Sequence, residues 1–168
     1  MSFKNHYVRM TVLVQRVIRL SLLVFFGLSP VLAHKVGKVS RFMCTQSNEV
    51  NLRRGPERKY PVDWKFIKSR YPLLVIAEYG TWRKVRDFDH VEGWVHQSML
   101  TSKPRRGVIK TATNLYKSPK ADSKVIAFVD PKVFVTIKTI KPSWCRVEAN
   151  GFEGWVPRSH VWGVLDHE

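Results

Sequence analysis

The hydrophobic positions of this chain come in short runs, and polar turn residues separate the runs. Such runs fall at 73–76, 82–85 and 94–95, and they are rich in β-branched and aromatic side chains. Glycine, proline, asparagine and aspartate fill the intervals, and Asn150-Gly151 is the pair favoured in two-residue β-hairpins. No amphipathic helical spacing follows residue 33. The pattern therefore predicts an all-β fold made of small barrels.

The same pattern occurs twice along the chain. The matching segments are 51–56 and 114–119, 73–76 and 135–138, 82–85 and 144–147, and 92–95 and 153–156. The spacing between matching segments shortens in two steps along the chain, which single-residue deletions in two loops explain. We therefore expect two tandem barrels over 48–102 and 108–165, joined by a linker at 103–107.

Residues 1–33 have the organisation of a secretory signal peptide. Four basic residues and no acidic residue precede an uncharged run over 20–33 that ends in Val31-Leu32-Ala33. This run of 14 residues is shorter than the roughly 20 residues of a membrane-spanning helix. We expect cleavage after Ala33, a lead-in over 34–47, no stable transmembrane anchor, and a periplasmic or secreted protein.

The charge is strongly positive, with 29 Lys+Arg against 13 Asp+Glu and a net charge of +16. Removal of Lys4, Arg9, Arg16 and Arg19 with the signal peptide would still leave +12. A protein of this charge is attracted to anionic partners. The charge alone does not choose between nucleic acid, anionic lipid and the carboxylates of an envelope polymer.

The first repeat contains four motifs in a fixed order. They are N-L-R-x-G-P at 51–56, Tyr60-Pro61, W-R-K-V-R-D at 82–87 and E-G-W-V at 92–95. This succession resembles the bacterial Src-homology-3-like domain, and the tandem arrangement is similar to exported two-domain proteins of alphaproteobacteria. The resemblance covers roughly 40–165 and implies SH3-like barrels, cell-wall association and peptide binding beside the loops.

The second repeat departs from that pattern. Tyr116 and Lys117 stand where the first repeat has two arginines, Ser118 replaces a glycine, and the Tyr-Pro pair has no counterpart. We therefore expect the two copies to bind differently, with the second copy serving a structural role.

The candidate binding residues gather in the first repeat. They are Arg53, Arg54, Arg58, Tyr60, Trp64 and Trp82. Arginine offers a bidentate fork to carboxylates, and an aromatic ring beside it adds stacking area. The alternative is that the charges form a solvated face and that the tryptophans pack the barrel and its ends. Trp64 is the best candidate among the tryptophans, because the alignment of the two copies places Ile126 opposite it.

Catalysis and metal binding find little support in the residues. A cysteine nucleophile needs a base within reach, and nothing marks a histidine as the partner of Cys145. Asp87, Asp89 and His90 lack the spacing of a metal site, and Asp87 is expected to close a hairpin turn. Cys44 and Cys145 either form a disulfide in an oxidising compartment or remain two separate thiols.

These observations predict a non-catalytic exported binding module without a cofactor. The leading hypothesis is docking on a cell-envelope component, with peptidoglycan or its peptide stems as the first candidate. One alternative is a protein–protein scaffold that binds extended or Pro-rich peptides of a periplasmic or secreted partner. Another is nonspecific nucleic-acid binding, against which export argues.

Overall fold

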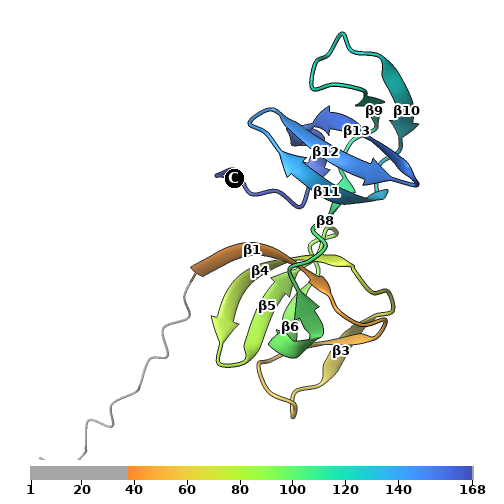
Figure 1. Ribbon diagram of the computed structural model, residues 1–168. Coiled ribbons are helices and arrows are strands. Elements are labelled where there is room, and N and C mark those ends of the chain that lie inside the picture. The colour runs from red at the N-terminus through yellow and green to blue at the C-terminus, as the bar shows by residue number, and fades with distance from the viewer. Residues whose placement is uncertain (1–37, 168) are drawn as a thin grey trace, which may run out of the picture. The chain divides into compact units, whose positions relative to one another are not determined.

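Two seven-stranded antiparallel sheets make up residues 38–167, the part of the chain that the computed structural model describes (Figure 1). The first sheet contains β1 (Lys38–Thr45), β2 (Val50–Arg53), β3 (Val62–Phe66), β4 (Pro72–Tyr79), β5 (Trp82–Arg86), β6 (Glu92–His96) and β7 (Leu100–Thr101). The second contains β8 (Arg106–Ile109), β9 (Thr113–Tyr116), β10 (Val125–Val129), β11 (Phe134–Ile140), β12 (Trp144–Ala149), β13 (Phe152–Pro157) and β14 (Val161–Trp162). A single 3-10 turn precedes each last strand, η1 (Gln97–Met99) and η2 (Arg158–His160).

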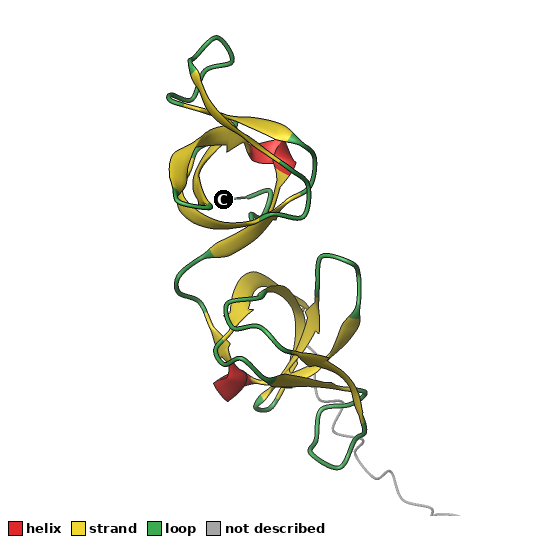
Figure 2. Cartoon of the chain, turned by 90° about the vertical axis from the view of Figure 1, so that its right-hand side faces the viewer, coloured by secondary structure: helices red, strands yellow, loops and turns green. Residues whose placement is uncertain are grey.

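The two sheets have the same topology, which confirms the duplicated all-β fold. The first has the strand order β3-β2-β6-β5-β4-β1-β7, and the second has β10-β9-β13-β12-β11-β8-β14. The pairing registers agree as well, because Arg53 pairs with Trp94 as Tyr116 pairs with Trp155. Each sheet curls around its own core (Figure 2).

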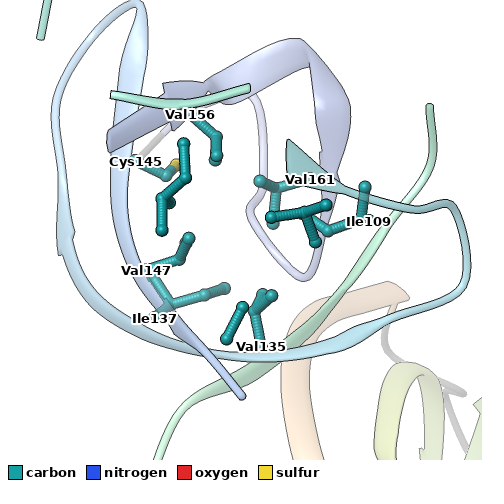
Figure 3. Close-up of a cluster of buried hydrophobic side chains, with 10 residues drawn as sticks. Ile109, Val135, Ile137, Cys145, Val147, Val156 and Val161 are labelled. Atoms are coloured by element: carbon teal, nitrogen blue, oxygen red, sulfur yellow. The ribbon is translucent and has the colours of Figure 1, made fainter. Parts of the chain in front are cut away.

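Each core is built from the side chains that point inward, at every second position along the strands. Leu52, Leu73 and Val85 are fully buried in the first barrel. In the second barrel, Ile109, Val135 and Val147 point into one cluster (Figure 3). None of Trp82, Trp94, Trp144 and Trp155 belongs to these buried clusters, so the tryptophans of the repeat lie partly exposed outside the cores.

The first strand of each barrel lies wholly or partly outside the expected bounds of the barrels. Strand β1 falls in the expected lead-in and pairs with both β4 and β7. Strand β8 begins inside the expected linker and pairs with β11 and β14. The non-strand connection between the sheets is therefore limited to 102–105.

The glycine of each E-G-W-V motif is required by a close crossing of strands. A Cβ atom on Gly93 would lie 2.6 Å from Cγ of Leu52, and one on Gly154 would lie 2.7 Å from the carbonyl oxygen of Tyr116. These glycines let β6 lie close against β2 and β13 close against β9. The motif therefore marks this crossing.

The expected turns are present. Asn150 and Gly151 both have positive φ, 50° and 86°, and join the paired residues Ala149 and Phe152. Asp87 accepts a hydrogen bond from the backbone N–H of Val91 at 2.8 Å and so closes the β5–β6 turn, as expected.

Aromatic side chains of the two barrels contact each other within one compact unit. The rings of Phe42 and Trp162 are 4.9 Å apart at an interplanar angle of 80°, and those of Tyr71 and Phe134 are 5.4 Å apart. Phe42 comes from β1 and Trp162 from the last strand of the chain. Strand β1, which the sequence pattern did not predict, thus supplies one of the rings in these contacts.

Tyr71 should titrate late. Burial, together with the nearby carboxylates of Asp87 and Asp89, raises the pKa of Tyr71 to about 12. Because the folded-state pKa lies above the ordinary value of 10.0, the phenol stabilises the fold below pH 10 and this contribution is lost as the pH rises toward 12. We expect a tyrosinate absorbance step near pH 12 that Tyr71→Phe removes. A titration of the variant that still contains this step would contradict the assignment.

No helix among residues 38–167 is long and apolar enough to cross a membrane. The expected signal peptide, residues 1–33, lies outside the described residues.

Candidate functional site

A groove of about 190 Å³ lies on the outer face of the first barrel. Its lining residues come from the start of β2, the β2–β3 loop, β5, the end of β6 and η1. They are Glu49, Asn51, Arg53, Arg58, Trp82, His96, Ser98 and Met99. Three of the six predicted binding residues, Arg53, Arg58 and Trp82, are therefore together in this groove.

Strand alternation places one wall of the groove. Val50 and Leu52 point into the core, with about 1% of each exposed, so Glu49, Asn51 and Arg53 point outward. This wall of the groove therefore follows from the alternation of polar and apolar residues over 49–53.

Arg53 is committed to holding the β2–β3 loop. Its Nη1 donates to the carbonyl oxygens of Arg58 at 3.0 Å and Tyr60 at 2.8 Å. These two bonds fix the loop beside the groove, so Arg53 shapes the site and positions Arg58.

The other cations of this loop differ in whether they form ion pairs. Arg54 pairs with Asp63, with 2.5 Å between Nε and Oδ1, and Lys59 pairs with Glu57 at 2.8 Å. The guanidinium of Arg58 makes no ion pair with any residue of the described range. Arg58 is therefore the cation of the groove that remains available to a ligand.

The opposite wall is aromatic and polar. The rings of Trp82 and His96, which face each other across β5 and β6, stand edge to face at 5.4 Å. His96 Nδ1 lies 2.7 Å from Ser98 Oγ and also accepts from the backbone N–H of Ser98 at 3.4 Å. These contacts orient the imidazole beside the partly exposed indole of Trp82.

Tyr60 and Trp64 do not line the groove. The ring of Tyr60 covers Gly55, where an added Cβ would meet it at 2.6 Å. Trp64 pairs with the inward Leu52 and is 55% exposed on the edge strand β3. In the second barrel Ala127 pairs with Leu115 in the same way, so the counterpart of Trp64 is Ala127, and the expected Ile126 is wrong because it is the adjacent position in the strand.

The corresponding face of the second barrel has a different chemistry. Tyr116 stands at the position of Arg53, and its ring contacts Trp144 edge to face at 5.5 Å. Pro157 pairs with Trp144 where His96 pairs with Trp82. The β9–β10 loop has the same length as the β2–β3 loop, and Ala121 occupies the position of Arg58. The second barrel thus has no charge at the position of Arg58.

Five groove residues were not among the sequence predictions, namely Glu49, Asn51, His96, Ser98 and Met99. The alternation of polar and apolar residues over 49–53 could have indicated the first two. His96, Ser98 and Met99 reach the groove through the pairing register of β5 with β6 and through η1. No sequence motif predicts either feature.

Both cysteines are buried as free thiols, Cys145 in the core of the second barrel and Cys44 against the carbonyl oxygen of Pro104. Burial raises the pKa of Cys44 and of Cys145, so neither thiol is activated as a nucleophile. Of the two expectations for this pair, the structure has the separate thiols.

Comparisons with known proteins agree with the duplicated barrel. The family model described as bacterial SH3 domain matches twice, over residues 46–101 and 110–163. The putative N-acetylmuramoyl-L-alanine amidase YrvJ of Bacillus subtilis (strain 168) is 25% identical over 131 residues, and the match covers 67% of this chain and 25% of that protein.

Two solved structures, NlpC2 and NlpC1 from Trichomonas vaginalis, match 74% of this chain at 15% and 14% identity, both with a TM-score of 0.36. The matches cover 48% and 46% of those chains. The present chain thus spans about a quarter of the curated relative and about half of the two solved structures.

Proposed function

Since the chain belongs to the bacterial SH3 domain family, with two copies of the domain in tandem, we propose that it is a non-catalytic binding protein of the cell envelope. The proposed ligand is peptidoglycan, recognised through the carboxylates of its peptide stems. The similarity to part of an amidase supports this choice, because proteins that act on the cell wall must hold it. The first barrel would carry the binding, and export of the chain is part of the proposal.

The single structural observation behind the proposal is that Arg58, which forms no ion pair within residues 38–167, lines the same groove as the indole of Trp82. A carboxylate can accept charge-assisted hydrogen bonds from Arg58. The adjacent peptide or sugar can stack on Trp82, and Asn51 and Ser98 offer hydrogen bonds to amide groups. The groove thus combines the groups that a carboxylate-bearing peptide requires.

Sedimentation of the residue 34–168 protein with purified sacculi tests the proposal. We expect the protein to pellet with sacculi, and Arg58→Gln to weaken this binding about tenfold, because a hydrogen bond to a charged group contributes about 1.5–3 kcal/mol. Trp82→Ala should weaken it similarly.

The matched control is Lys120→Gln, which removes one exposed positive charge from the equivalent loop of the second barrel. This control should bind like the unaltered protein if the groove matters and net charge does not. A protein that stays in the supernatant at low salt, or an equal effect of both substitutions, would contradict the proposal. Stoichiometric recovery of one protein partner at high salt would support the scaffold interpretation in its place.

A further inference from the structure

The groove of the first barrel has an acidic end and a basic end. Glu49 precedes β2, Asn51 lies within it, Arg53 ends it, and Arg58 lies in the loop beyond. At about 3.3 Å per residue, the outward row from residue 49 to residue 53 is roughly 13 Å long. Opposite charges are thus separated by a row that contains an amide side chain.

The residues of the neighbouring strand β6 and of η1 follow the same direction along the groove, from the basic end to the acidic end. Strand β6 runs antiparallel to β2 with Arg53 opposite Trp94, so His96 lies toward Asn51 and Ser98 toward Glu49. The middle of the groove therefore offers hydrogen-bonding side chains on both walls. Such groups suit the N–H and C=O groups of an extended peptide.

Both terminal charges are accessible to a ligand. Glu49 pairs with Lys65 at 3.2 Å, but these side chains are 71% and 49% exposed. Exposed pairs of this kind contribute little to stability, so an ammonium group can compete for the carboxylate of Glu49. At the other end Arg58 has no competing carboxylate within residues 38–167.

We infer that the groove selects short extended peptides with two free ends, the ammonium group at Glu49 and the carboxylate at Arg58. The row of about 13 Å from residue 49 to residue 53 is as long as about four extended residues, and Arg58 lies in the loop beyond it. This inference rests on the proposed function and narrows its ligand to stem peptides cut free from the glycan, because the amino end of an attached stem is bonded to muramic acid. The orientation of the peptide follows from the order of the charges.

The second barrel provides an internal comparison. With β9 aligned on β2, Ala112 stands at the position of Glu49 and Ala121 at that of Arg58, while Asn114 and Trp144 are kept. Its outer face thus keeps an asparagine and a tryptophan, has Pro157 where the first barrel has His96, and lacks both terminal charges. The second barrel should therefore not distinguish free from blocked peptide ends.

Four forms of one probe test the inference, namely tetra-alanine with free ends, N-acetylated, C-amidated, and blocked at both ends. Binding to the residue 34–168 protein is followed by NMR chemical shifts of the two barrels and by tryptophan fluorescence. We expect the free form to bind best, at the first barrel, and each block to weaken binding about tenfold.

Two charge-neutral variants assign each end of the peptide. Glu49→Gln should abolish the effect of acetylation and keep that of amidation, whereas Arg58→Gln should do the reverse. Lys120→Gln should change neither effect. Circular dichroism of all three variants verifies that they are folded.

The inference is overturned if tetra-alanine does not bind, if blocking its ends has no effect, or if both variants alter both effects equally. Sacculus sedimentation separates this result from failure of the proposed function. Sacculi that pellet the protein in an Arg58-dependent manner, with tetra-alanine ends without effect, would leave envelope binding intact and remove the preference for free ends. Loss of both signals would remove both.

Discussion

Leu115→Ala is expected to destabilise the second barrel by about 2–5 kcal/mol, the range found for leucine-to-alanine changes in protein cores. Leu115 is fully buried and packs in a cluster with nine other buried residues, so its truncation would leave a cavity in the core. Urea denaturation followed by circular dichroism gives the size of the effect, and amide hydrogen exchange identifies the barrel.

Leu52→Ala is the matched variant in the first barrel, because Leu52 pairs with β3 as Leu115 pairs with β10. Val125→Ala, at a site that is 46% exposed, should change stability by less than about 0.5 kcal/mol. If Leu115→Ala and Val125→Ala have similar effects, the second core is not packed as described.

Gly154→Ala is expected to destabilise the second barrel by about 1–3 kcal/mol, through overpacking. The new Cβ would lie 2.7 Å from the backbone oxygen of Tyr116 and 2.8 Å from Cγ of Leu115. A backbone atom cannot move aside without shifting its strand. The same denaturation measurement reports the change.

Gly93→Ala is its counterpart in the first barrel and should be milder, because the nearest atom there belongs to the Leu52 side chain. The carbonyl oxygen of Arg53 is farther away, at 3.0 Å. Only Gly93→Ala should also weaken sacculus binding, because it disturbs the residue that holds the groove loop. Equal loss of sacculus binding in both variants would contradict this link.

The duplicated fold could be predicted because turns and strand pairs recur in the sequence. The segments that match between the copies occupy corresponding positions in the pairing registers of the two sheets. The first strands were missed because β1, KVSRFMCT, and β8, RGVI, share little sequence. Their pairing is set by the strands beside them, which no local pattern reveals.

The candidate site was predicted in part. Arginines and an aromatic residue in one loop identified Arg58, but the same reasoning selected Arg54 and Tyr60. The sequence does not state that Asp63 lies beside Arg54, because this contact depends on how β3 pairs with β2. The ring of Tyr60 similarly lies over Gly55. The arginines and the tyrosine identified the β2–β3 loop as a candidate site. The pairing of β2 with β3, which the sequence does not show, determines which of its side chains face the groove.

The position of β1 matters for how this protein can be divided into pieces. The segments that match the family, 46–101 and 110–163, begin after β1 and β8 respectively. A fragment cut at 46 would leave the backbone of β4 and β7 without its shared neighbour and create an open sheet edge prone to association. Separate production of either barrel should therefore start ahead of Lys38 or Arg106.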